Sequence, residues 1–468
     1  MRFVIALFGC IFFCVSSNLM AQQLDSVSQK IDTALQRIVT IKNIQLKGNK
    51  RTKDYIIFRE ITVKTGETLS MAALQKQLEI SRNLVFNTAL FLIAKIYVSA
   101  ENNGLVDIQI EVKERWYFFP TPYFRLIDRN FNQWWVDQKR SLDRVNYGLK
   151  FIQGNLTGRN DELNIWLITG YTQQVNFRYN LPFLDKKLKH GFNIGVVQST
   201  QKEVNINTNA NKQVFFRSTE TIRKLTRQDV TYNYRPDQLW RHSFRLSYVN
   251  EWVADTILKL NPQYFAANKN RQQYIDFYYG FRYLNLDYFA YPTKGFTASG
   301  YVYKRGLTAA TNLWQLGFSA LYAKHVWKKA FVNVSAAATI KLANETVFTN
   351  QRLFGFGDFQ MRGYEYNVID GNAGILGRAT IFQELFGYNL KTYIKSKTYN
   401  KIPFKVYLKM YTDIGYAHSN FAKNSVLNNK PIFSGGIGLD IVSIYDFVFR
   451  IEYSFNQLGI RGLYLDYQ

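Results

Sequence analysis

Residues 447–455 are FVFRIEYSF, and this stretch decides the fold. Large apolar side chains occupy every odd position, while Arg450, Glu452 and Ser454 lie between them. Successive side chains of a β-strand point to opposite faces, so one face of this strand is apolar and the other is polar. The same alternation occurs in residues 275–283 (IDFYYGFRY) and 175–181 (VNFRYNL).

About fifteen such segments fill residues 116–468, and helical periodicity is missing there. Aromatic residues gather at segment ends, as in Trp134-Trp135 and residues 288–291 (YFAY). Dividing about 350 residues by roughly 22 for each strand and its loop gives about 16 strands. Aromatic girdles and a polar inner face favour a transmembrane antiparallel β-barrel over the alternative, a soluble multi-sheet protein.

The composition excludes other classes of protein. Aromatic residues make up 16 % of the 468 residues, so the chain can bury enough apolar surface to fold. Mean hydropathy is −0.22, and no long uncharged apolar run follows residue 21, which excludes a bundle of membrane-spanning helices.

The first 21 residues resemble a secretory signal peptide. Arg2 precedes an apolar segment, Val4 to Val15, and Ala21 is a plausible cleavage residue. Both cysteines, Cys10 and Cys14, lie in this segment. We therefore expect an exported protein whose mature chain has no disulfide, thiolate metal site or cysteine nucleophile.

A short amphipathic helix or linker is expected over residues 22–39, and a small α+β domain over residues 40–115. The expected order in the domain is β-α-α-β-β, with Ser70 as the N-cap of its second helix. Residues 101–104 (ENNG) form the expected turn of a terminal hairpin. The predicted fold is thus mainly β, a barrel preceded by one small domain.

Residues 354–364 (FGFGDFQMRGY) are rich in glycine and too irregular for a strand, so we expect a long loop. A strand follows that places Arg378 and Glu384 on one face. In residues 405–415, parity sends Asp413 and Gly415 into the barrel together with Lys405 and Lys409. An unpaired carboxylate at that position invites a cationic partner.

These motifs resemble the outer-membrane assembly and translocation superfamily, which includes BamA/TamA-like proteins and two-partner secretion transporters. The resemblance rests on G-x-G-x4-R-G-Y at 355–364, the inward Glu384, Asp413-Ile414-Gly415, and N-x-x-G-R at 155–159. The preceding α+β domain is similar to a POTRA domain. The resemblance implies a 16-stranded barrel whose sixth extracellular loop folds back into the lumen.

Carried onto this sequence, the resemblance implies a lock between loop and wall. Arg362 would pair with Asp413, and Glu384 would be a second acceptor nearby. Gly363 would allow the tight bend, Tyr364 would pack against the wall, and Gly415 would leave space beside Asp413. The alternative is that Arg362 is an ordinary exposed loop cation.

The resemblance also implies a weak seam where the first strand meets the last. Pro120 and Pro122 lie in the first strand and cannot donate ladder hydrogen bonds, while Gly459 and Gly462 loosen the last. The alternative is that these residues merely end strands irregularly. Client strands or lipid would pass to the bilayer through such a seam.

The expected function is assembly or translocation of unfolded client protein at the outer membrane, with the N-terminal domain in the periplasm. The sequence leaves a solute channel with a periplasmic anchoring domain as the alternative. The small domain is expected to capture clients, to act as a spacer, or to dock accessory periplasmic or lipoprotein subunits. Room for one such domain favours a dedicated or accessory translocator over a general insertase. The sequence also ends in Tyr467-Gln468 instead of the terminal aromatic residue that is common in outer-membrane proteins.

The net charge of +25 is spread over many segments. It suits a cationic lumen and loops that face outer-membrane lipid and surface glycolipid, not nucleic acid. The sequence has no HExxH, G-x-S-x-G or P-loop motif, so we expect no enzyme, no cofactor and no metal site.

Overall fold

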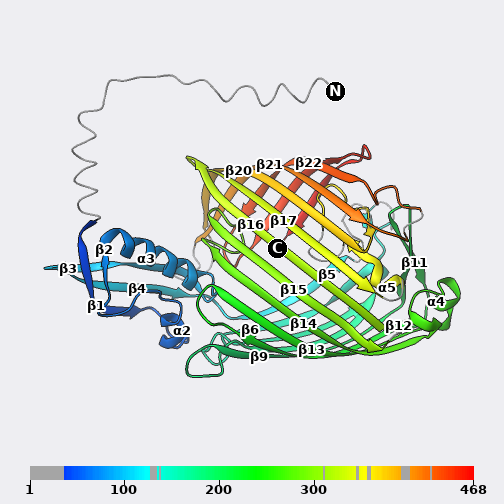
Figure 1. Cartoon of the computed structure of the whole chain (residues 1–468), viewed down its shortest axis with the longest axis horizontal. Coiled ribbons are helices and arrows are strands. Elements are labelled where there is room, and N and C mark those ends of the chain that lie inside the picture. The colour runs from blue at the N-terminus through cyan, green and yellow to red at the C-terminus, as the bar shows by residue number, and fades with distance from the viewer. Residues whose placement is uncertain are drawn as a thin grey trace, which may run out of the picture.

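The computed structural model describes residues 36–126, 134–135, 139–308, 311–343, 347–355, 360–391, 401–421 and 424–467. A small α+β domain lies at one end of a large β-barrel (Figure 1). The expected signal peptide and residues 22–35 of the expected helix lie outside the described residues, and Ile38 and Val39 begin a strand instead. No helix in the described part of the chain is long and apolar enough to cross a membrane.

The N-terminal domain has a four-stranded sheet in the order β2-β1-β4-β3, with two helices. Its elements are β1 (Ile38–Lys47), α2 (Asp54–Phe58), β2 (Thr68–Ser70), α3 (Met71–Phe86), β3 (Phe91–Asn102) and β4 (Leu105–Glu114). The expected order missed β2, which three residues form by pairing antiparallel with β1. Ser70 caps α3 as expected, since its hydroxyl accepts a hydrogen bond from the Ala73 amide at 3.2 Å.

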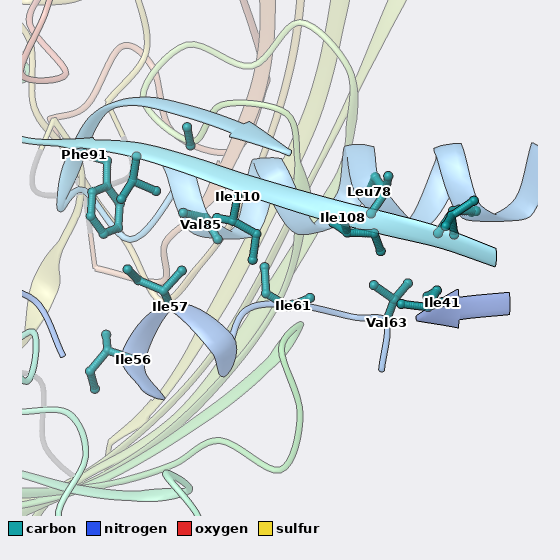
Figure 2. Close-up of a cluster of buried hydrophobic side chains, with 14 of the residues drawn as sticks. Ile41, Ile56, Ile57, Ile61, Val63, Leu78, Val85, Phe91, Ile108 and Ile110 are labelled. Carbon is teal, nitrogen blue, oxygen red and sulfur yellow. The ribbon is translucent and has the colours of Figure 1, made fainter. Parts of the chain in front are cut away.

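The core of this domain lies between α3 and the sheet (Figure 2). Leu74, Leu78 and Val85 recur along one face of α3, and they pack against Ile108 and Ile110 of β4. Figure 2 shows α2 and the segment after it closing the other side through Ile57 and Ile61. The amphipathic periodicity of α3 therefore fixes how the helix sits on the sheet.

The barrel is one sheet of sixteen strands, in which each strand pairs antiparallel with the next. The strands are β5 (Phe118–Leu126), β6 (Val145–Gly154), β7 (Glu162–Gly170), β8 (Thr172–Leu181), β9 (His190–Gln201), β12 (Arg223–Tyr234), β13 (Trp240–Val253), β14 (Arg271–Leu286), β15 (Gly295–Thr308), β16 (Thr311–Trp327), β17 (Ala330–Ala343), β20 (Ala373–Lys391), β21 (Lys401–His418), β22 (Pro431–Val442), β23 (Val448–Asn456) and β24 (Arg461–Tyr467).

Smaller elements lie in the loops. At the end of the barrel opposite the N-terminal domain, Figure 1 shows β11, α4 and α5. The loop elements are η2 (Leu142–Arg144), β10 (Glu203–Asn209), β11 (Lys212–Arg217), α4 (Asp255–Leu260), η3 (Ala266–Asn268), α5 (Phe348–Gln351), β18 (Arg352–Phe354) and β19 (Ile369–Asp370). The long loops thus lie at the far end, and the turns at the near end face the small domain.

The two faces of the barrel differ as the alternation predicts. On β21, the side chains of Met410 and Ile414 are 59 % and 52 % exposed on the outer face. Lys409 and Asp413, on the opposite face, are 3 % and 0 % exposed. An apolar outer face suits contact with lipid, and a polar inner face is typical of the lumen of a membrane-spanning barrel.

Candidate functional site

The loop between β17 and β20 (residues 344–372) is the sixth connection at the far end of the barrel. Its described residues pack as a small apolar core on the inner side of β20, β21 and β22. This core contains Phe354, Met361 and Tyr364 of the loop together with Leu376 and Ile432 of the wall. Of the expected glycine motif, Gly355 belongs to the described residues and residues 356–359 do not.

Arg362 and Asp413 form the centre of this contact. The Arg362 Nε donates to both carboxylate oxygens of Asp413, at 3.2 and 3.0 Å, and Nη2 also bonds Oδ1. The backbone amide of Arg362 donates to Oδ2 at 3.1 Å. The Asp413 carboxylate therefore binds both the side chain and the main chain of Arg362. Such a charge-assisted, bidentate contact is stronger than a neutral hydrogen bond, and it also fixes the orientation of the arginine.

Other groups of the wall complete the binding of Arg362. Its Nη1 donates to the Thr380 hydroxyl at 3.0 Å. Its guanidinium carbon lies 3.9 Å from the centre of the Tyr411 ring, a cation–π distance. The Nε of Arg378 lies 3.8 Å from Asp413, so the buried carboxylate faces two cations.

Gly363 and Tyr364 continue the contact beyond Arg362. Gly363 has φ +80°, where L side chains are strained, and an added Cβ would lie 3.3 Å from the Cβ atoms of Ser434 and Ser454. The Asn456 amide donates to the Gly363 carbonyl at 2.6 Å. The Tyr364 hydroxyl donates to the Phe433 carbonyl at 3.1 Å.

Gly415 lies under the loop. A Cβ at this position would be 3.4 Å from the Met361 sulfur and 3.7 Å from the Phe354 ring. A side chain longer than a methyl group would push these loop residues away from the wall. The absence of a side chain at Gly415 therefore allows the loop to approach β21 closely.

The structure does not bring Glu384 to Arg362, and that expectation is wrong. The Glu384 carboxylate accepts bonds from Lys329 at 3.1 Å and from Lys405 at 3.0 Å. Glu384 is opposite Tyr407, whereas Arg378 is opposite Asp413. Six residues of strand separate the two positions, about 20 Å along the wall.

Lys409 is also held by wall residues. Its ammonium contacts the carboxylates of Asp440 and Glu452, at 2.5 and 2.6 Å, in a buried cluster. The Tyr291 hydroxyl, which comes from the turn between β14 and β15, donates to Asp440 at 3.0 Å. The alternation of side chains along β21 predicted that Lys409 faces inward. It could not predict which residues of the neighbouring strands would bind Lys409.

The sheet begins at β5 and ends at β24, and among the described residues no ladder joins these two strands. Pro120 and Pro122 are exposed on β5, opposite Phe151 and Leu149 of β6. Gly459 has φ +76° in the turn before β24. Gly462 lies in β24, where a Cβ would meet the Tyr464 ring at 3.0 to 3.2 Å.

The N-terminal domain contacts the near-end turns of the barrel, which the sequence did not predict. Arg235, from the turn between β12 and β13, donates to both oxygens of Glu60 at 2.8 and 3.1 Å. The Glu60 side chain is 2 % exposed. The Arg59 side chain donates to the carbonyls of Leu188 and Asp237, at 2.9 and 2.8 Å.

Further contacts lie around the same mouth. Arg115 binds Asp446, between β22 and β23, through Nη1 at 2.7 Å and Nη2 at 3.2 Å. The N-x-x-G-R turn also contacts the domain, since the Asn155 amide donates to the Thr52 hydroxyl at 2.9 Å. Burial raises the pKa of Tyr117 to about 12, and its hydroxyl donates to the Leu90 carbonyl at 3.1 Å.

The apolar outer face, the charged inner face and the small domain at the near mouth define an outer-membrane β-barrel protein with a periplasmic domain. The chain belongs to the Omp85 superfamily, because the model of the Omp85 superfamily domain matches residues 155–455. A second family model, POTRA, described as a surface antigen variable number repeat, matches residues 39–115. These matches confirm the family that the motifs suggested.

The chain is similar to a number of solved structures, among them a CdiB and a BamA. CdiB from Escherichia coli has a TM-score of 0.54 and 11 % sequence identity, over 96 % of this chain and 83 % of that one. BamA from Haemophilus ducreyi lacking POTRA domains 1–3 has a TM-score of 0.49 and 15 % identity, over 97 % and 94 %. The likeness to CdiB supports the barrel fold. No curated protein matches the sequence.

Membership of the superfamily fixes the general role and place of the protein. The barrel lies in the outer membrane, and the POTRA domain lies in the periplasm. At the level of the family, the role is outer-membrane protein assembly or secretion, and members act as transporters or insertases.

Proposed function

We propose that the protein binds unfolded client polypeptide in the periplasm and inserts it into, or exports it across, the outer membrane. The β17–β20 loop acts as a lock that constricts the lumen. The observation that carries this proposal is the contact of Arg362 with the fully buried Asp413. Bonds to both the side chain and the main chain of Arg362 fix the loop against the barrel wall, which an exposed loop cation would not do.

The unjoined edges of β5 and β24 support a lateral route for the client. A strand edge with free amide and carbonyl groups can pair with an extended client chain. Pro120 on β5 cannot donate to such a ladder, which weakens pairing between the two edges of the barrel itself. A client strand, or membrane lipid, would enter the bilayer between these edges.

The POTRA domain suits the capture step. Its sheet ends in β3, whose outer edge has no partner strand among the described residues. Extended polypeptide can add to such an edge, and periplasmic or lipoprotein accessory subunits are further candidate partners for this domain. The outer face and the far loops would contact membrane lipid and surface glycolipid.

Conductance of the purified protein in planar bilayers tests the lock. We expect small, flickering currents from the wild-type protein, and larger currents from both Arg362→Ala and Asp413→Ala, because each change removes the same contact. Glu384→Ala is the control, since its carboxylate binds Lys329 and Lys405 instead. A large, steady wild-type current that neither lock variant alters would refute the lock and indicate a solute channel.

A further inference from the structure

The inner wall of the barrel carries two arginines in directly opposed positions. Arg241 on β13 is the cross-strand partner of Arg282 on β14. Both residues line one cavity of about 550 Å³ inside the barrel. Like charges that face each other across a ladder repel, so this arrangement is destabilising unless an opposite charge lies between them.

The described lining of this cavity supplies no opposite charge, although Arg241 also lines an adjoining cavity with Asp161 and Glu162. Three arginines and no acidic residue belong to the described lining of the cavity. The third, Arg378, lies 3.8 Å from Asp413 on the far side. The Arg241 Nε is buried and has no hydrogen-bond partner among the described residues. Glu60 is one carboxylate whose charge acts on Arg241, and Arg235 already binds both of its oxygens.

Serine residues are neighbours of both arginines in the sheet, and the Arg282 guanidinium carbon also lies 5.5 Å from the centre of the Phe289 ring. Ser299 on β15 is the cross-strand partner of Arg282, and its hydroxyl lies 2.8 Å from that of Ser319. Ser243 lies two residues from Arg241 and lines the same cavity. Guanidinium forks and hydroxyl donors together suit a ligand with several acceptor oxygens.

We propose that this cavity is a binding site for a phosphate group, held between Arg241 and Arg282. The two arginines carry a charge of +2, and a phosphate monoester carries about −1.5 to −2 at pH 7, so one group neutralises the pair. A carboxylate would leave one positive charge uncompensated. The phosphate is either a free oxyanion that enters through the lumen or the headgroup of a phosphorylated glycolipid.

Isothermal titration of the full-length protein in detergent tests this site. One arm titrates inorganic phosphate, and the other uses mixed micelles that contain a phosphorylated glycolipid, compared with its dephosphorylated form. The test variant is Arg241→Gln/Arg282→Gln. The control is Lys324→Gln/Lys430→Gln, which makes the same change of charge at two exposed positions outside the described lining of this cavity.

We expect at least tenfold weaker binding by the lumenal variant, in at least one arm, and binding by the control within twofold of wild type. Loss in the phosphate arm alone assigns a soluble ligand, and loss in the micelle arm alone assigns a lipid headgroup. The proposal is overturned if wild-type protein binds in neither arm, or if the control loses as much affinity as the lumenal variant.

Thermal unfolding without phosphate gives an independent check that also reports folding. Removal of two opposed charges should leave the melting temperature of the lumenal variant equal to or above that of wild type. Phosphate should then raise the melting temperature of the wild type and not that of the variant. A lower melting temperature of the variant in phosphate-free buffer would mean that the arginines stabilise the wall themselves, which contradicts the proposal.

Discussion

Replacement of Asp413 by alanine should release the β17–β20 loop. The carboxylate is 0 % exposed, and it accepts bonds from both the side chain and the backbone amide of Arg362. Removal of one partner from a buried ion pair costs about 3–5 kcal/mol, because the other charge is left without compensation. The Arg362 side chain is 19 % exposed, so it can reach water by leaving the wall.

This free energy acts on the docking of the loop more than on the folding of the barrel. At 1.4 kcal/mol per factor of ten, about 3–5 kcal/mol raises the undocked population by a factor of roughly 10² to 10⁴. The bond after Arg362 is a trypsin site. When docking and release are fast compared with cleavage, the cleavage rate follows the undocked population.

The assay is therefore trypsin cleavage after Arg362 in the folded protein, followed by mass spectrometry. We expect Asp413→Ala to accelerate this cleavage by a factor of roughly 10² to 10⁴. Asp466→Ala is the matched control, because the Asp466 side chain is 65 % exposed and pairs with Arg450 at the surface. Such a pair contributes about 0–1 kcal/mol, so cleavage should rise less than about fivefold. An unchanged rate in Asp413→Ala would refute the reasoning.

Three further predictions concern the loop, the domain interface and the domain core. Gly363→Ala should accelerate the same tryptic cleavage by roughly 5- to 30-fold, since a left-handed backbone costs about 1–2 kcal/mol in an L-residue. Glu60→Gln leaves Arg235 without its counter-charge, which costs about 2–5 kcal/mol and should raise hydrogen exchange in the 235–239 turn at least tenfold. Glu79→Gln, in a pair whose side chains are 48 % and 64 % exposed, should change that exchange less than about fivefold. Ile110→Ala should destabilise the POTRA domain by about 2–5 kcal/mol in denaturant titrations, while the barrel stays folded by its heat-modifiable electrophoretic mobility.

Alternation along single strands made the barrel and the inner face predictable. Asp413 could be placed on that face by parity, since strand geometry has a period of two whatever the neighbouring strands are. The family resemblance placed Glu384 near Arg362, and parity could not correct this expectation because it says nothing about height along the wall. The ladder registers set that height, and they depend on pairing between strands far apart in sequence.

Contacts between parts of the chain were harder to predict. The three residues of β2 are too few to show the alternation that distinguishes a strand from a turn. They form a strand because they pair with β1, which is about 30 residues earlier in the sequence. The bonds of Arg59, Glu60 and Arg235 join segments between 129 and 178 residues apart. No local periodicity encodes such a pair. A weak signal was present at residues 155–159, whose turn motif contacts the domain through Asn155.

The Arg115–Asp446 pair has a consequence for how the barrel can open. Arg115 comes three residues before β5, and Asp446 comes two residues before β23, which pairs with β24. These side chains therefore tie the two unjoined margins of the sheet together at the periplasmic end, where no backbone ladder does so in the described chain. At the extracellular end, no described pair joins β5 to β24. If the seam between β5 and β24 opens as we propose, the Arg115–Asp446 pair would hold its periplasmic end closed, and the two strands would separate first at the opposite end.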